Sequence, residues 1–197
     1  MNPKEKRIIA FHEAGHAITG HFLEHANPVQ KITIVPRGIG ALGYTLQAPL
    51  EDRYLISKEE LLDRIANLMG GRVAEEIVFE RISTEAQDDL ERASDLARRM
   101  VCQYGMSENV GPVSYADSRT GNFLDVQQLN KPFSEKTTRK IDQEVKNIIR
   151  GERSRARMLL EQKRDLLDRT ADTLLESETL TKQNFEAIAG EPNVAAA

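Results

Sequence analysis

The chain has 197 residues, 40% of them apolar, which suits one domain or two small ones. Its 27 Lys and Arg residues against 31 Asp and Glu residues give a formal net charge of −4, and it has no tryptophan. Such a chain lacks the basic surface and the aromatic platforms of a nucleic-acid-binding protein. The single cysteine, Cys102, excludes an internal disulfide framework and a zinc cluster built from cysteines. No apolar run approaches the roughly 20 residues that span a bilayer, and helix formers dominate, so we expect a soluble, mainly α-helical protein.

The first predicted element is a helix over residues 5–24, because its apolar side chains recur at spacings of three and four. Pro28 breaks this helix. Two short strands are expected next, over residues 29–35 and 42–46, with a turn rich in Pro and Gly between them. Glycine weakens the second strand as a central strand but lets another backbone come close. We expect this hairpin to be the only sheet of consequence.

A second helix is predicted from Ser57 to Val78, opened by a capping box that Ser57 forms with Glu60. The Gly70-Gly71 pair inside it costs about 1 kcal/mol per residue relative to alanine. Such a cost in the middle of a helix indicates that another element packs closely there.

Thr84 and Gln87 form a second capping box, and the helix that they open is predicted to stop at Gly105. The segment 107–132 is rich in Gly, Asn, Ser, Asp and Pro, which predicts a long irregular loop. From Ser134 onward the apolar periodicity is helical again.

One segment carries chemistry: His12-Glu13-Ala14-Gly15-His16 fits the pattern His-Glu-x-x-His. On a helix, His12 and His16 lie one turn apart and about 40° apart around the axis, so both imidazoles can reach one metal ion. Glu13 projects about 100° from His12, which places a carboxylate beside the metal as a base. Zinc accepts two histidines and a carboxylate and keeps a position for water, so the motif predicts a zinc hydrolase acting on peptide bonds.

An accidental pair of histidines on a helix surface is the alternative interpretation. The apolar helix around the motif, its small intervening residues and the presence of only four histidines in the chain argue against it. His21 and His25 repeat the spacing without a glutamate after the first histidine. We interpret these two as exposed or helix-capping residues.

Helical phase ranks the candidates for a third ligand. Asp89 falls on the apolar stripe of its helix, whereas Asp88 falls on the opposite, charged stripe. A carboxylate facing a core is costly unless it is paired or bound to a metal, which favours Asp89 as the ligand. The plain alternative is a first-turn acid stabilised by the helix dipole, and Glu75 and Glu76 remain alternative ligands.

These motifs occur in a specific order, together with shorter ones, over residues 11–17, 36–38, 41–43, 70–76, 89–93 and 102–107. In that order the sequence resembles the peptidase domain of the FtsH-type ATP-dependent zinc proteases, over nearly the whole chain. The resemblance implies a mainly α-helical zinc-peptidase domain with a small β-hairpin and a C-terminal helical bundle. We expect a metallopeptidase core over residues 1–106, an irregular loop over 107–133 and a helical region over 134–197 that packs on the core in one continuous domain.

The resemblance also implies one Zn²⁺ per chain, held by His12, His16 and Asp89, with Glu13 as the catalytic base. A strand that is thought to pair with extended substrate in this family corresponds to Ala41, Leu42, Gly43, Tyr44 and Thr45.

The resemblance also has implications for partners and cellular location. The resemblance implies unfolded or misfolded polypeptides as substrates, a homo-hexamer, and an AAA ATPase module with a membrane anchor in a longer protein. That protein would lie at the cytoplasmic face of the bacterial inner membrane, or in an organelle matrix or stroma. We therefore expect this chain to be an excised domain, with a standalone relative as the alternative. The rival function is an inactive helical oligomerisation or adaptor module that retains the metal motif.

The chain departs from the family pattern at four positions. Glu85 and Asp88 stand where the family usually has glycine and commonly asparagine, and both add negative charge near the predicted site. That charge would raise metal affinity or hinder acidic substrates. Asp125 and Val126 replace the expected Gly and Arg, which leaves the role of that loop open.

Overall fold

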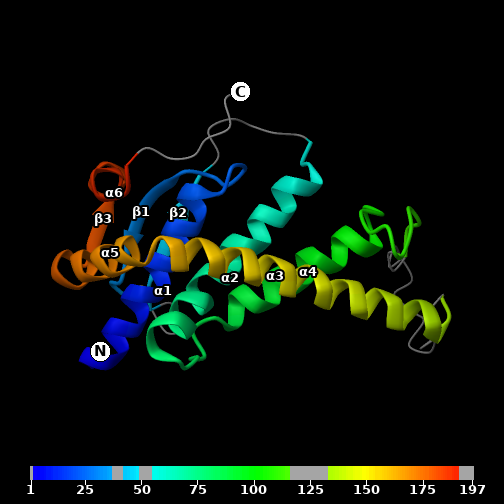
Figure 1. The fold of residues 1–197 in the computed structure, drawn as a ribbon, viewed down its shortest axis with the longest axis horizontal. Coiled ribbons are helices and arrows are strands. Elements are labelled where there is room, and N and C mark those ends of the chain that lie inside the picture. Colours follow the sequence, from blue (N-terminus) through cyan, green and yellow to red (C-terminus); the bar gives the residue numbers. More distant parts are fainter. Residues whose placement is uncertain (1, 37–41, 49–54, 116–132, 191–197) are drawn as a thin grey trace, which may run out of the picture.

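A computed structural model describes residues 2–36, 42–48, 55–115 and 133–190 (Figure 1). Over these ranges the chain is mainly α-helical with one small antiparallel sheet, which confirms the predicted fold class. In chain order the elements are α1 (Pro3–Phe22), β1 (Val29–Thr33), β2 (Tyr44–Gln47), α2 (Lys58–Phe79), α3 (Gln87–Cys102), α4 (Glu135–Gln162), α5 (Arg164–Ser177), β3 (Thr179–Thr181) and α6 (Lys182–Ala189). No helix in the described ranges is both long and apolar enough to cross a membrane.

Helix α1 is the centre of the core and packs against α2, α5 and the sheet, while α4 crosses over α2 and α3 (Figure 1). It begins two residues before the predicted start because Asn2 caps it. The Asn2 side chain accepts a hydrogen bond from the backbone N–H of Glu5, and the Glu5 carboxylate accepts one from the backbone N–H of Asn2. One cluster of buried apolar side chains joins α1 to all the other helices and to β1 and β3, with Ile18, Ile65, Leu160 and Phe185 among its members.

The crossing of α1 and α2 is close enough to exclude side chains. A Cβ atom on Gly15 would lie 2.4 Å from the carbonyl oxygen of Gly70, and one on Gly70 would lie 2.8 Å from the carbonyl oxygen of Gly15. A Cβ atom on Gly71 would lie 2.5 Å from Nε2 of His12. The close packing predicted from the glycine pair is therefore confirmed, and one of its partners is a motif histidine.

We expect Gly15→Ala to destabilise the fold by about 1–3 kcal/mol, because the new methyl group meets backbone that cannot move aside cheaply. Gly151→Ala is the matched control, since a Cβ atom there has no neighbour within 4 Å. In the middle of α4 this alanine should stabilise by roughly 0.5–1 kcal/mol. Urea unfolding of both variants measures the difference, and equal effects would contradict the close crossing.

The sheet has the strand order β2-β1-β3, with both pairs antiparallel. The predicted hairpin is present, with Ile32 of β1 opposite Thr45 of β2. The expectation that it forms the only sheet of consequence was incomplete, because β3 pairs with the other edge of β1 and places Leu180 opposite Ile32. The sequence did not predict β3, because a strand of three residues is too short to show an alternating apolar pattern. Among the described residues, β2 is thus an edge strand.

The helix containing Asp89 starts later than predicted. Ala86 occupies the N-cap of α3 without a side-chain hydrogen bond, and the backbone N–H of Gln87 donates to the carbonyl oxygen of Thr84 at 3.1 Å. The predicted second capping box was therefore wrong, because residues 84–86 form a turn before the helix begins. Ser57, in contrast, caps α2 as predicted by accepting from the backbone N–H of Glu60.

His21, which the sequence suggested to be exposed or helix-capping, is buried, so the first of these two interpretations was wrong. Its Nε2 donates to the carbonyl oxygen of Gly190 at 2.9 Å, and its ring packs edge-to-face on Phe185. The sequence pattern missed this because α6, which covers His21, lies about 160 residues further along the chain. His25 is partly exposed and lies 3.4 Å from a carboxylate oxygen of Asp63.

Candidate metal centre

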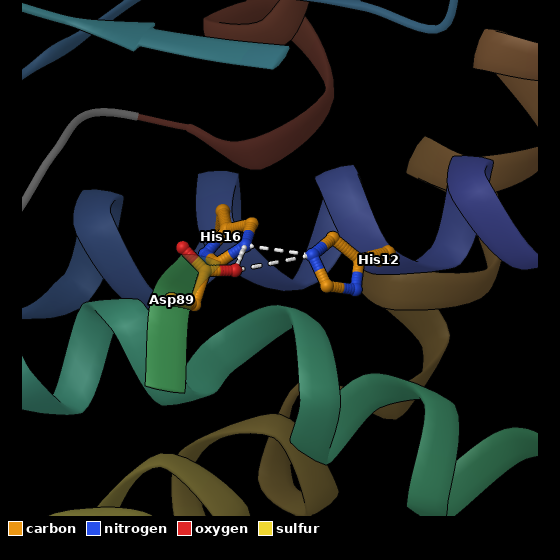
Figure 2. A group of neighbouring side chains, drawn as sticks. All are labelled: His12, His16 and Asp89. Carbon is orange, nitrogen blue, oxygen red and sulfur yellow. Dashed lines mark hydrogen bonds and ion pairs between the residues drawn. The ribbon is translucent and has the colours of Figure 1, made fainter. Parts of the chain in front are cut away.

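Helix α1 presents His12 and His16 to the same point, one turn apart. Their Nε2 atoms are 3.0 Å from each other, and the rings meet edge-to-face. The His12 and His16 side chains are 3% and 12% exposed, so both lie largely below the protein surface. The two nitrogens thus face one small volume, as Figure 2 shows.

Asp89 reaches the same volume from the first turn of α3. Its Oδ2 lies 3.0 Å from Nε2 of His16 and 3.3 Å from Nε2 of His12. One ligand atom from each of the three residues lies within 4.8 Å of the others (Figure 2). Asp88 is 78% exposed and points toward Arg92 instead. The structure therefore brings together the three residues proposed from the sequence and leaves the neighbouring aspartate outside.

The remaining ring nitrogens of the histidines are held by α2. Nδ1 of His12 lies 2.7 Å from Oε1 of Glu75, and Nδ1 of His16 lies 2.9 Å from the carbonyl oxygen of Asn67. Since both partners accept hydrogen bonds, each Nδ1 carries a proton, so a metal ion that displaces the other ring proton would find the lone pair on Nε2. Two imidazole nitrogens and one carboxylate oxygen, oriented in this way, fit a zinc ion that keeps a fourth position for water.

The alternative ligands point elsewhere. Glu75 contacts the far nitrogen of His12, and its second oxygen accepts from the backbone N–H of Ser83. The Glu76 carboxylate pairs with Arg72 and Arg153. Glu75 is buried and orients His12 through this contact, a role that the sequence pattern did not reveal.

The three converging groups are strongly coupled. Burial by itself would lower the pKa of His12, but the carboxylates of Asp89 and Glu75 outweigh it and raise that pKa to about 10. Burial would raise the pKa of Asp89, yet electrostatic attraction to His16, together with hydrogen bonds to His12 and His16, holds it well below its usual range. A positive charge shared among these groups is therefore strongly favoured, and a divalent cation supplies it by displacing protons.

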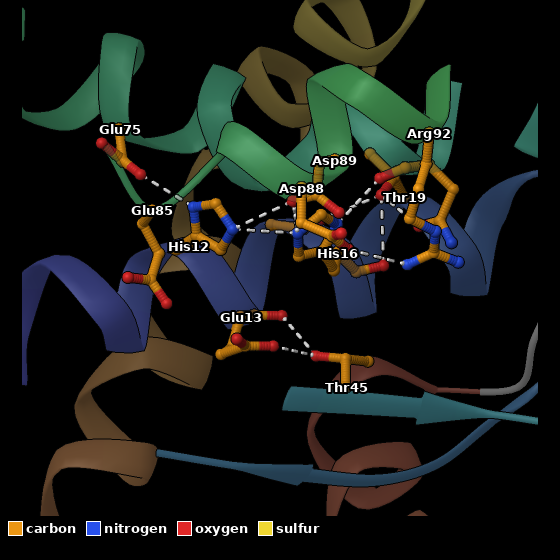
Figure 3. A network of polar contacts seen from close by, with 12 residues as sticks. His12, Glu13, His16, Thr19, Thr45, Glu75, Glu85, Asp88, Asp89 and Arg92 are labelled. Atoms are coloured by element: carbon orange, nitrogen blue, oxygen red, sulfur yellow. Dashed lines mark hydrogen bonds and ion pairs between the residues drawn. The ribbon is translucent and has the colours of Figure 1, made fainter. Parts of the chain in front are cut away.

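Glu13 is buried next to the converging atoms, on the side of α1 that faces the sheet (Figure 3). Its Oε2 accepts a hydrogen bond of 2.7 Å from Oγ1 of Thr45. Burial is the main influence on this carboxyl and raises its pKa, against the opposing effects of His16 and Thr45. A carboxylate with a raised pKa beside a metal site holds a proton more readily than an ordinary one, which suits a group that accepts and returns a proton.

Two of the four residues that depart from the family pattern, Glu85 and Asp88, border an open hollow beside the site. Its volume is about 400 Å³, and its lining is mostly polar or acidic: Leu42, Thr84, Glu85, Gln87, Asp88 and Glu91. Burial raises the pKa of Glu85, and the nearby carboxylates of Glu13, Glu75 and Asp89 add to the effect against His12. Glu85 therefore interacts electrostatically with His12, Glu13 and Asp89 of the site.

The predicted substrate strand reaches the site at one end. Leu42, Gly43, Tyr44 and Thr45 are half-buried, and Gly43 and Thr45 contact Glu13. Ala41, the remaining residue of that prediction, lies outside the described residues, as do Asp125 and Val126.

Comparison with known proteins places the chain in a family. Residues 1–188 match the model of Peptidase family M41. The chain is 52% identical over 190 residues to the ATP-dependent zinc metalloprotease FtsH of Rhodothermus marinus, covering 96% of this chain and 27% of that protein. It is 49% identical over 191 residues to the FtsH of Kosmotoga olearia, covering 96% and 30%. With FtsH 4 of Synechocystis it shares 46% identity over 194 residues, covering 97% and 31%.

The chain thus spans less than a third of the length of these relatives. The family model spans residues 1–188, and each of these relatives covers 96% or more of the chain. The resemblance inferred from the ordered motifs is confirmed: the chain belongs to peptidase family M41, the family of the FtsH-type proteases.

Proposed function

We propose that this chain is a zinc-dependent endopeptidase domain that hydrolyses peptide bonds in unfolded or misfolded polypeptides. The observation that carries the proposal is the convergence of Nε2 of His12, Nε2 of His16 and Oδ2 of Asp89, with the Glu13 carboxylate buried beside them. These three residues would hold one Zn²⁺, which when bound supplies Lewis acidity at the scissile carbonyl and lowers the pKa of water.

In the proposed reaction, the protein's own groups orient the reactants and move the proton. Glu75 and the Asn67 carbonyl group fix the two imidazole rings through their Nδ1 atoms. The carboxylate of Glu13 takes a proton from the attacking water and returns it to the leaving amine, for which its raised pKa prepares it. The burial of Glu13 keeps bulk water away from this transfer.

The substrate is proposed to lie along β2 as an added strand. An edge strand offers unpaired backbone groups to an extended peptide, and β2 is such an edge among the described residues. Since Thr45 contacts Glu13, a peptide paired with residues 41–45 would run past the catalytic carboxylate. Strand addition requires an extended segment, which supports unfolded polypeptides as the substrate class.

The wider architecture is also a proposal. The three relatives compared above are named ATP-dependent, and this chain covers less than a third of each. We infer that the chain works as the peptidase part of a homo-hexamer that carries an AAA ATPase module and a membrane anchor. Such a protein would act at the cytoplasmic face of a bacterial inner membrane, or in an organelle matrix or stroma. By itself the domain should cleave only flexible chains, because folded substrates need the motor.

Elemental analysis and a casein assay test the function together. We expect about one zinc per chain and cleavage that a chelator abolishes and that added Zn²⁺ restores. Native protein with neither zinc nor cleavage would instead favour the adaptor module. Zinc without cleavage of flexible substrates, in the presence of intact Glu13, would overturn the proposed chemistry while keeping the metal site.

A further inference from the structure

The carboxylate of Glu13 is held by a contact that comes from the sheet. Oγ1 of Thr45 donates to Oε2 of Glu13 at 2.7 Å and also lies 3.2 Å from the carbonyl oxygen of Glu13 (Figure 3). The Glu13 side chain is only 4% exposed. Within the described ranges, Thr45 is the one residue that hydrogen-bonds this carboxylate.

The second oxygen of the carboxylate lies against bare backbone. A Cβ atom on Gly43 would lie 2.9 Å from Oε1 of Glu13 and 3.0 Å from its Cγ. Gly43 therefore leaves space for Oε1, while Thr45, two residues further along in β2, hydrogen-bonds Oε2. The carboxylate of a glutamate otherwise turns easily about its last torsion, which is broad and roughly two-fold.

We propose that Thr45 is a positioning residue that engages Oε2 of Glu13 and thereby leaves Oε1 as the oxygen that handles the proton. Because Thr45 belongs to the strand along which the substrate is proposed to lie, the orientation of the base is tied to the strand that holds the peptide. This inference rests on the proposed endopeptidase function. It assigns Thr45 a role through its side chain, distinct from backbone pairing with substrate.

The test removes the hydroxyl group and keeps the shape. Thr45→Val should lower kcat about 10- to 100-fold, since a misoriented base costs rate rather than affinity, while KM and zinc content stay close to native values. Thr45→Ser, which restores the hydroxyl, should keep kcat within about threefold of native. Thr33→Val is the matched control. The Thr33 hydroxyl group bonds the carbonyl oxygen of Glu178 and the hydroxyl group of Thr179 in β3, at the other edge of the sheet. The loss of these bonds should leave kcat unchanged.

A readout without turnover keeps the inference testable even where cleavage fails. In zinc-free protein, Thr45→Val should lower the urea midpoint, because a buried carboxylate loses its donor. In a Glu13→Ala background the same substitution should leave the midpoint unchanged. Thr45→Ala serves as a second variant if valine impairs folding.

The outcomes separate the two proposals. Native protein without zinc or cleavage refutes the endopeptidase function. The urea unfolding midpoints of Thr45→Val, with and without Glu13→Ala, then still show whether Thr45 stabilises the Glu13 carboxylate. Active native protein with an unchanged kcat in Thr45→Val overturns the positioning role alone. A raised KM with native kcat would also overturn it, since Thr45 would then act on substrate binding.

Discussion

Glu13→Gln is expected to reduce casein cleavage by about 10²–10⁴-fold while the protein still binds one zinc per chain. Glutamine keeps the shape and can still accept the Thr45 hydrogen bond, but it cannot take a proton. The metal should stay because Glu13 is not among the three converging groups. Initial cleavage rates and elemental analysis of the same preparation measure both effects.

The stability of this variant gives an internal check. Burial raises the pKa of Glu13, which means that burying the charged carboxylate costs free energy. Glu13→Gln should therefore unfold at the same or a higher temperature than the native protein. Glu161→Gln, which changes an exposed acid of α4 that pairs with Arg157, is the control for loss of one charge. Cleavage at the native rate in Glu13→Gln would refute the assignment of the base.

The second large effect is expected at Asp89. Asp89→Asn should weaken zinc binding by more than about 100-fold, since loss of a metal ligand costs more than loss of a group that only hydrogen-bonds a ligand. Asp88→Asn should change it by less than about threefold, because Asp88 is exposed and points toward Arg92. Competition with a chromophoric chelator measures both affinities.

This pair of variants is matched in the ways that matter. Both substitutions remove one negative charge from the first turn of α3, so they affect the helix dipole and the net charge alike. If Asp89 were only a first-turn acid, the two variants would lose the same stability and bind zinc equally. Weaker binding in Asp88→Asn than in Asp89→Asn would reverse the choice of ligand.

Local patterns predicted most of the helices well. The core face of α1 follows from the spacing of its apolar residues, and Gly70-Gly71 correctly indicated a close crossing. Patterns failed where a neighbour distant in sequence decides the outcome. β3 exists because β1 offers it an edge, and His21 is buried because α6 covers it.

The candidate site divides along the same line. The sequence by itself determined that His12 and His16 share a helix face, because four residues make about one turn and no partner is needed to align them. Helical phase also turned Asp89 inward. Only the tertiary structure decided that Asp89 meets the histidines, because α2 packs against both α1 and α3 and so brings together residues more than 70 positions apart in the chain. It likewise assigned Glu75 to the far nitrogen of His12 and brought Thr45 to Glu13. Glycines allow both approaches, because Gly15 and Gly70 let α1 and α2 meet backbone to backbone, and Gly43, just before β2, leaves room for the Glu13 side chain.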